Sequence, residues 1–210
     1  FISKALEKTE YVSIELLHVY RQQDDRFLEV LNKVRNNILD KKSIEELNSR
    51  VQTGYIAEDE GYITLTTHNA KAQNINESRL GRLKTNPKPF RAQIEGNYPE
   101  YNFPTNSELI LKEGAQVMFV KNDPFAEKRF FNGKIGKVIS MDEDAVEVLC
   151  PEDKESITVY PLEWQNIRYT IDNETKEIKE EIEGTFTQIP LKLAWAITVH
   201  KSQGLTFDKA

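Results

Sequence analysis

The end of the chain concentrates polar side chains that could hold an anion. Thr198, His200, Lys201, Ser202 and Gln203 stand within six residues and offer hydroxyl, imidazole, ammonium and amide groups. Side chains of these types bind the phosphate groups of nucleotides and nucleic acids. An apolar run precedes them and would anchor them, so the segment predicts a rigid group of hydrogen-bond donors that faces an anionic ligand.

A second polar cluster stands where a predicted strand meets a predicted helix. Thr66, Thr67, His68 and Asn69 end the strand predicted over residues 61–69, and a helical pattern follows over residues 70–83. The N–H groups at a helix N-terminus are free and favour a phosphate. A simpler interpretation is that Asn69 only caps the helix, although capping alone would not require Thr67 and His68.

Arg21 is the third candidate for anion chemistry. Residues 10–20 are rich in β-forming side chains and predict a buried strand, and a helix is predicted to begin after a cap at Asp24 or Asp25. Arg21 therefore stands at a strand exit ahead of a helix, an edge where α/β proteins place ligands. The alternative is a surface ion pair between Arg21 and one of the two aspartates.

Two further helices are indicated by their end signals. The segment Ser43–Glu46 has the pattern of a capping box and predicts a short helix to about Arg50. Pro190 and Gly204 mark the two ends of a final helix, because proline suits the first helical position and glycine the left-handed residue beyond the last turn. Its apolar stripe would consist of Leu191, Ala194, Trp195 and Thr198. This helix is expected to present the terminal polar cluster on its last turn.

The middle of the chain changes from helical patterns to strand patterns. Residues 87–104 are rich in proline, glycine, asparagine and aromatic side chains and predict a connector or an extended arm. Short β-rich runs then alternate with turn signals at roughly 8–12-residue spacing, which is typical of a small barrel or sandwich. The runs are 115–120, 134–140, 145–150, 156–160 and 168–171, with a returning strand over 176–188. Their number and extent suit an SH3-like barrel.

The order of these patterns predicts an α/β domain that carries an inserted, small all-β domain. Because the β-rich stretch lies between two α/β stretches, residues 1–105 and 189–210 are expected to pack as one domain. Residues 106–188 are expected to form the insert.

The charge of the chain is unevenly distributed. The net charge of −6 argues at first against a nucleic-acid partner. Residues 141–183, however, hold fourteen Asp and Glu against four Lys and Arg, so the remainder of the chain is positive. Residues 68–91 carry six basic side chains and only Glu77 as an acid. Because attraction depends on where charge is placed, the overall sign does not exclude a polyanion.

Several classes of protein are disfavoured by what the sequence lacks. No apolar run reaches the length of a membrane span, and the first residues do not form a signal peptide. Cys150 is the single cysteine, so no internal disulfide is possible and a reducing cytoplasm is favoured. His18, His68 and His200 lie far apart in the sequence, and no metal site is expected. The chain starts without Met and breaks off within a pattern, so we expect a piece of a longer protein.

Three segments, in this order, resemble the later motifs of superfamily-one helicases, and most closely the Pif/RecD-like branch that moves 5′ to 3′ on DNA. They are Leu17–Gln22 with Phe27 and Leu31-Asn32, Leu65–Asn69 with Ile75-Asn76, and Ala194–Gly204. Connecting segments at 111–118, 121–122, 132–133 and 188–191 are similar to the same proteins. The resemblance covers nearly the whole chain, and Ala194–Gly204 is its most specific part.

The resemblance implies a fold and a nucleotide partner. Residues 1–105 and 189–210 would belong to the second RecA-like domain, a P-loop NTPase fold with a parallel sheet and helices, and residues 106–188 to its inserted SH3-like domain. Arg21 would reach the γ-phosphate of an ATP held mainly by the first RecA-like domain, and would stabilise charge on the transferred phosphoryl group. Gln203 and Gly204 would lie toward the nucleotide. ATP and Mg²⁺ would be cofactors of the full-length protein.

The resemblance also implies a track for single-stranded DNA. The residues that would line it are Thr67, His68, Asn69, Thr198, His200, Lys201 and Ser202. Contacts to phosphates would bind a strand without sequence preference. Such a protein would act in DNA repair or recombination, in the cytoplasm at the nucleoid, and its SH3-like domain could bind a protein partner.

The motifs that hold ATP in this family are missing from these residues. No Gly-x-x-x-x-Gly-Lys-Ser/Thr phosphate loop occurs, and no acidic magnesium-binding motif follows an early strand. The chain alone is therefore expected neither to bind ATP tightly nor to hydrolyse it. Two alternatives remain open: an SH3-like module that binds a peptide or nucleic acid without ATP chemistry, and a RecB-like nuclease. A nuclease would need a carboxylate cluster with a lysine near a metal, and the sequence shows no such spacing.

Overall fold

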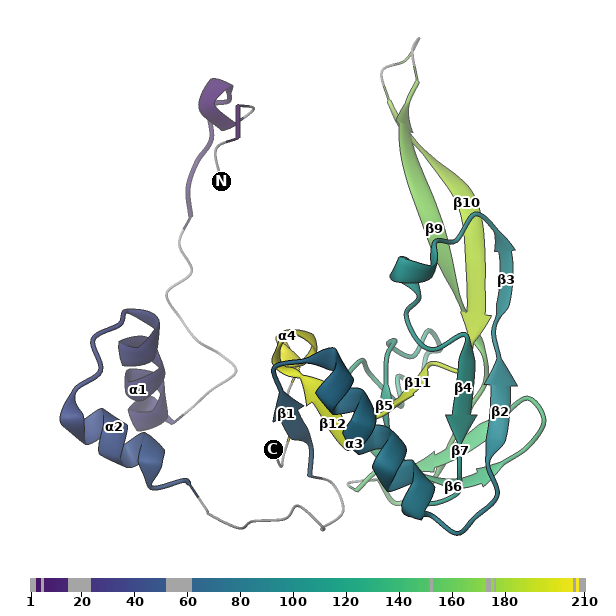
Figure 1. Ribbon diagram of the computed structural model, residues 1–210. Helices are drawn as coiled ribbons and strands as arrows, with labels where there is room; N and C mark the ends of the chain where they lie inside the picture. Colours follow the sequence, from purple (N-terminus) through teal and green to yellow (C-terminus); the bar gives the residue numbers. More distant parts are fainter. Residues whose placement is uncertain are drawn as a thin grey trace. The chain divides into compact units, whose positions relative to one another are not determined.

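The structure is a computed structural model of the 210-residue chain (Figure 1). The residues that it describes are 3–4, 6–14, 24–51, 62–151, 153–172, 175, 177–205 and 207. The chain divides into two compact units, Phe1–Tyr55 and Ile56–Ala210, and each has its own set of elements.

The first unit is helical in the described residues. Its elements are the 3-10 helix η1 (Leu6–Lys8) and the α-helices α1 (Asp25–Arg35) and α2 (Lys41–Asn48). Of the two aspartates considered as the cap of α1, Asp24 is the cap, and its carboxylate accepts hydrogen bonds from the backbone N–H groups of Arg26 and Phe27, both at 3.0 Å. Residues 10–14 form no strand. The rest of the predicted strand, and Arg21, lie outside the described residues.

The predicted capping box at Ser43 is wrong, because α2 begins three residues earlier than a Ser43 cap would place it. The cap is Asp40, whose carboxylate accepts a hydrogen bond from the backbone N–H of Ser43 at 2.8 Å. The Lys33 ammonium, 2.9 Å from this carboxylate, and the Ser43 N–H hold the pKa of Asp40 well below its usual range. A carboxylate is favoured over a hydroxyl here because it also interacts with the helix dipole.

The second unit contains a parallel strand pair with a helix against it. Strands β1 (Thr64–Thr66) and β12 (Ala196–Thr198) pair in parallel although they lie far apart in the sequence. Helix α3 (Asn69–Arg82) contacts both strands, which confirms the helix predicted over residues 70–83. The strand predicted over residues 61–69 is present but short, because the chain turns into α3 directly after Thr67.

An antiparallel sheet of five strands forms most of the core. Its order is β11-β5-β6-β7-β8. The strands are β11 (Leu191–Leu193), β5 (Gln116–Phe119), β6 (Ile135–Met141), β7 (Val146–Leu149) and β8 (Ile157–Val159). The four runs predicted between residues 115 and 160 are thereby confirmed as strands. Fully buried side chains at Val117, Phe119, Val138, Val146 and Val148 pack in one cluster, and burial of this apolar area stabilises the sheet.

Two smaller antiparallel sheets complete the second unit. One has the order β3-β10-β9, with β3 (Gln93–Gly96), β10 (Ile178–Gln188) and β9 (Leu162–Ile171). The other pairs β2 (Lys88–Arg91) with β4 (Glu108–Leu111). Strands β9 and β10 extend as a long two-stranded ribbon away from the other sheets of this unit (Figure 1).

Residues 87–104, predicted to be a connector or an extended arm, are extended over two stretches, but these stretches pair into sheets and do not form a simple connector. This segment contains β2, β3 and the 3-10 helix η2 (Glu100–Asn102). Pro89 is compatible with β2 because that strand has only one neighbour, and proline is tolerated on edge strands. Phe90 is buried in the main core, so tertiary packing outweighs the local turn-like composition.

Strand pairs join the expected insert, residues 106–188, to the segments on either side. Strand β4 pairs with β2, and β5 pairs with β11. Strand β10 also pairs with β3. Three pairs therefore connect residues 106–188 to residues 88–96 and 191–193.

The final helix predicted from Pro190 to Gly204 is wrong over most of its length. Strands β11 and β12 occupy this segment, and only α4 (Val199–Ser202) is helical. Of the residues that matched helical spacing, Leu191, Ala194 and Thr198 are buried because the strands pack on two sides, whereas Trp195 is half-buried. A strand buried on both faces has a continuous apolar run, and its periodicity does not distinguish it from a helix.

A smaller core joins the parallel pair to the five-stranded sheet. Its buried members are Ile63, Met118, Ala194 and Ile197. The carboxyl edge of β1 and β12 is thus fixed against the main core. Among the described residues, no helix combines the length and the apolar content that crossing a lipid bilayer requires.

Candidate functional site

The two predicted polar clusters meet at one edge of the β1–β12 pair. Thr66 lies opposite Thr198 in the parallel register, so the two segments that follow β1 and β12 leave the strand pair at the same edge. His68 follows one strand and His200 follows the other. The carboxyl ends of parallel strands are where open α/β sheets bind ligands, and here they carry both clusters.

Helix α3 begins at this edge without a side-chain cap. The cap position is His68, and its side chain makes no capping hydrogen bond. Its Nδ1 instead lies 2.8 Å from Thr67 Oγ1. Asn69 is the first helical residue, so the interpretation that Asn69 caps α3 is wrong. The first-turn N–H groups of α3 receive no capping side-chain oxygen, and with the helix dipole they favour an anion.

The residues from the end of β12 onward differ in how far they are open to a ligand. Thr198 is buried, whereas His200 and Lys201 are exposed. The Ser202 hydroxyl donates a hydrogen bond to the Val199 carbonyl at 2.7 Å. Beyond α4, Gln203 and Gly204 are exposed, and Gly204 has a positive φ of 82°, as expected for a residue that ends a helix.

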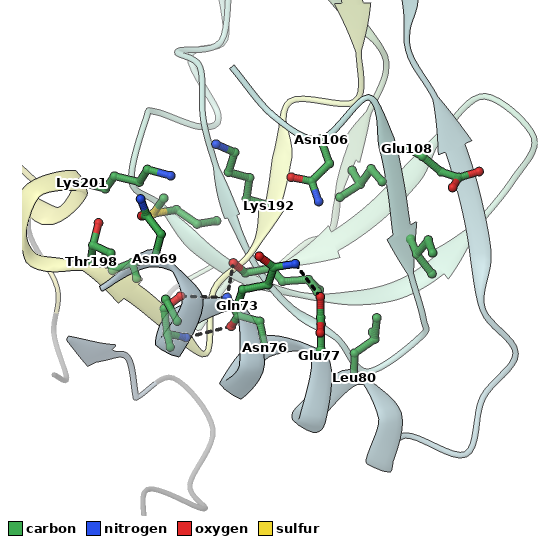
Figure 2. A pocket seen from close by; sticks show the side chains of 17 residues that line it. Asn69, Gln73, Asn76, Glu77, Leu80, Asn106, Glu108, Lys192, Thr198 and Lys201 are labelled. Carbon is green, nitrogen blue, oxygen red and sulfur yellow. Dashed lines mark hydrogen bonds between the residues drawn. The ribbon is translucent and has the colours of Figure 1, made fainter. Parts of the chain in front are cut away.

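A groove with a cavity volume of about 360 Å³ lies beside this edge (Figure 2). Its walls come from α3, residues 106–110, Met118, β11, β12 and Lys201 of α4. Figure 2 shows Asn69, Thr198, Lys192 and Lys201 gathered at one end of the groove. The groove therefore connects residues of both polar clusters with a lysine that neither contains.

Lys192 is the functional candidate that sequence reasoning missed. It lies on β11 between Leu191 and Leu193, and burial, with a smaller contribution from nearby Lys201, lowers its pKa to about 8. The sequence signal for Lys192 is a single charged residue between two leucines, but the run that contains it predicts a helix. In a strand the same alternation places Lys192 on the face opposite to the leucines.

Asn76 fixes α3 against β12. Its Nδ2 donates a hydrogen bond to the Ala196 carbonyl and its Oδ1 accepts one from the Ala196 N–H, both at 2.9 Å. One amide side chain thus satisfies both backbone groups of a strand residue. The middle of α3 and the beginning of β12 are held together by this contact.

Comparison with known proteins identifies the relatives of the chain, although no family model matches it. The ATP-dependent DNA helicase Pif1 of Bdellovibrio bacteriovorus is 30% identical over 99% of this chain and 45% of its own length. The Pif1 helicase of Psychrobacter sp. is 33% identical over 86% of this chain and 34% of its own length. The chain is a homologue of the Pif1 helicases over nearly its whole length. It spans less than half the length of these relatives.

Solved Pif1 structures have the same fold. The crystal structure of Bacteroides sp. Pif1 in complex with ADP-AlF4 matches with a TM-score of 0.81 and 34% identity, over 91% of this chain and 43% of that one. Bacteroides Pif1 bound to single-stranded DNA matches with a TM-score of 0.65 and 35% identity, over 93% of this chain and 44% of that one. Those Pif1 proteins therefore bind a nucleotide analogue and a DNA strand.

The part of the predicted site that concerns ATP is not brought together by the described residues. Arg21 lies outside them, and its distance to Gln203 and Gly204 is not defined. Within the described ranges, no group of three His, Cys, Asp or Glu side chains is arranged to hold a metal ion. What the structure does assemble is the edge that carries the residues predicted to contact a strand.

Proposed function

We propose that the chain supplies the second motor domain of an ATP-dependent DNA helicase that moves along single-stranded DNA, 5′ to 3′, and unwinds duplex. The observation that carries the proposal is the parallel register of Thr66 with Thr198, which places two distant phosphate-binding candidates at one edge. Homology to Pif1 helicases supports it, as do the Pif1 structures that contain ADP-AlF4 and single-stranded DNA.

The chain would contribute two domains to the helicase. Residues 1–105 and 189–210 form the second RecA-like domain, to which β1, β12 and α3 belong. Residues 106–188 form the inserted SH3-like domain, to which β5 to β8 belong. The strand pairs β2–β4 and β5–β11 would hold the inserted domain against the RecA-like domain. The two domains would therefore stay joined by backbone hydrogen bonds when they move.

The DNA track runs along the carboxyl edge of β1 and β12. Its residues are Thr67, His68, Asn69, Thr198, His200, Lys201 and Ser202. Most of these side chains end in hydroxyl, imidazole or ammonium groups, which bind phosphate oxygens and do not read base edges. The track would therefore grip a strand of any sequence.

The nucleotide would bind between this domain and a first RecA-like domain. Arg21, supplied from this side, stabilises the charge on the transferred γ-phosphoryl group of ATP with Mg²⁺, and Gln203 and Gly204 lie near the nucleotide. Because these 210 residues contain no phosphate loop, this chain alone would not hydrolyse ATP. ATP binding would close the cleft between the two RecA-like domains, and hydrolysis would open it. The affinity of each RecA-like domain for the DNA strand would differ between the closed and the open state, so the two domains would hold the strand in turn.

The strand contacts are tested with His200→Ala/Lys201→Ala in the intact helicase. Removal of an imidazole and an ammonium should weaken binding of an oligonucleotide and make the dependence of log K on log[salt] shallower by roughly 0.7 for each phosphate that the variant no longer neutralises. Fluorescence anisotropy at several salt concentrations measures both. Lys154→Ala is the control, because this exposed lysine lies on the turn before β8. A salt slope equal to that of the wild type would remove the proposed track.

The role of Arg21 is tested separately with Arg21→Ala in the intact helicase. Removal of the guanidinium should lower the rate of DNA-stimulated ATP hydrolysis by a factor on the order of 10³ or more. The affinity for single-stranded DNA should stay within about twofold of wild type. Phosphate release in the presence of oligonucleotide measures the first quantity, and anisotropy measures the second. Turnover at the wild-type rate would contradict the assignment.

A further inference from the structure

We propose that Lys192 binds a phosphodiester group of the DNA strand at the end of the groove where Asn69, Thr198 and Lys201 meet. The inference rests on the proposed function. It adds a residue of β11 to a track otherwise built from the segments that follow β1 and β12.

The position of Lys192 is set by the sheet. Its neighbour Leu191 is fully buried and pairs with Phe119 of β5, and the Leu191 carbonyl accepts a hydrogen bond from Thr105 Oγ1 at 2.6 Å. With the backbone fixed in this way, Lys192 projects from the opposite face into the groove. Lysine stems normally carry the ammonium out to water, whereas this lysine is partly buried on the wall of a cavity.

The acidic side chains of the groove do not neutralise this lysine. Glu77 accepts a hydrogen bond from Gln73 Nε2 at 2.7 Å, and Glu108 pairs with Arg91 Nε at 3.3 Å. Within the part of the chain that the structure describes, no ion pair or hydrogen bond joins either carboxylate to Lys192 or to Lys201. Two cations thus share one end of a groove without a counter-charge between them.

An anion at this end of the groove would stabilise the protonated form of Lys192. Burial and the charge of Lys201 both disfavour protonated Lys192, and together they lower its pKa to about 8. A phosphate placed between the two ammonium groups stabilises both charges, and the first-turn N–H groups of the 14-residue helix α3 add to the attraction. Binding would therefore raise the pKa of Lys192 and weaken as the pH rises through about 8.

The groups that face Lys192 are few, so the pH dependence can be assigned. Lys201 of α4, Glu77 of α3 and Glu108 of β4 are the charged residues that line the same groove. Only Lys201 contributes to the shift in the pKa of Lys192 besides burial. Substitution of Lys192 alone should therefore remove the part of the pH dependence that belongs to this site.

The experiment measures binding of fluorescein-labelled oligo(dC) to the intact helicase by anisotropy at constant low salt, at pH 7 and at pH 9. With a pKa of about 8, the charged fraction of Lys192 falls by about tenfold over this range, so wild-type affinity should fall by up to that factor. Lys192→Gln should bind about tenfold more weakly at pH 7 and show little change with pH. Lys192→Arg should keep its affinity at both pH values. Lys154→Gln is the control and should match wild type.

Lysine side-chain NMR distinguishes the strand from a free anion. The ε-carbon signal of Lys192 is assigned by its disappearance in Lys192→Arg, and its pKa should rise on addition of oligo(dC) but not of inorganic phosphate at the same phosphate concentration. An equal rise with inorganic phosphate would overturn the assignment to a strand. Wild-type affinity and pH profile in Lys192→Gln would overturn the role of Lys192 while leaving the proposed function intact. Absence of oligo(dC) binding by wild type would count against the proposed function itself.

Discussion

At the scale of single residues, amide side chains join segments of the second unit that lie far apart in the sequence. Gln116 Nε2 donates hydrogen bonds to the carbonyls of Tyr62 and Ala194, both at 2.9 Å, and so joins the chain ahead of β1 to the chain ahead of β12. Gln188 Nε2 donates to the Phe90 carbonyl at 3.0 Å and Asn76 binds Ala196 from α3. An amide can donate and accept at once, so a single side chain can satisfy backbone groups that no strand neighbour reaches.

Asn76→Ala should destabilise the second unit by about 2 kcal/mol, because the N–H and carbonyl of Ala196 lose their partner in a partly buried place. Urea denaturation followed by circular dichroism measures the free energy of unfolding. Asn74→Ala, at an exposed position of the same helix, is the matched control and should cost only a few tenths of a kcal/mol. Equal destabilisation in the two variants would show that the Asn76 hydrogen bonds contribute nothing.

At the scale of elements, the β9–β10 ribbon depends on one irregularity in its register. The pairing shifts between Ile182 and Gly184 of β10, close to where β10 begins to pair with β3. Asn97 follows β3 and packs tightly on this point, with its N–H donating to the Glu183 carbonyl at 2.8 Å. The shift leaves Glu183 out of the β9 register, as the extra residue of a β-bulge is left outside the ladder, and Asn97 bonds its carbonyl instead.

Gly184→Ala should destabilise the three-stranded sheet by about 1–3 kcal/mol, since overpacking costs this much. A Cβ atom there would lie 2.6–2.7 Å from backbone atoms of Asn97, and backbone cannot move aside as a flexible side chain does. The free energy of unfolding in urea is again the measurement. Gly81→Ala is the control: nothing lies within 4 Å of its added Cβ, and alanine in a helix should gain about 0.5 kcal/mol. A gain in both variants would contradict the tight packing at Gly184.

At the scale of the whole molecule, the reactivity of one thiol measures how readily the main core opens. Cys150 is buried with the strands of the five-stranded sheet, and burial raises its pKa to about 12. The thiolate is the reactive form, so a folded chain should present almost none of it at neutral pH. Reaction of Cys150 then requires opening of the core.

Labelling of Cys150 with a thiol reagent should be slower than that of an exposed cysteine by a factor on the order of 10³. The exposed reference is Lys154→Cys in a Cys150→Ala background, at a position on a surface turn. Absorbance of the released thiol-reagent product measures both rates, and low concentrations of urea should accelerate only the reaction of Cys150. Comparable rates in native buffer would show that the sheet opens readily around this residue.

Some of the fold could be predicted because its signals are local. Helix α3 and a cap of α1 at Asp24 or Asp25 follow from spacing and capping chemistry within a few residues, and the structure selects Asp24. The strands β5 to β8 follow from β-rich runs between turns. The two polar clusters could also be predicted, because the residues that form each of them stand next to one another in the sequence.

The sequence by itself therefore determined helices α1 and α3, the turn-bounded strands β5 to β8 and the chemical character of the two polar clusters. Only the tertiary structure decided that residues 191–193 and 196–198 are strands, that Thr66 lies beside Thr198, and that Lys192 enters the groove. The reason is physical: each of these depends on a partner strand, β5 or β1, that lies far away in the chain. Hydrogen bonds and burial gained across such a distance outweigh the local preference of an apolar run for a helix.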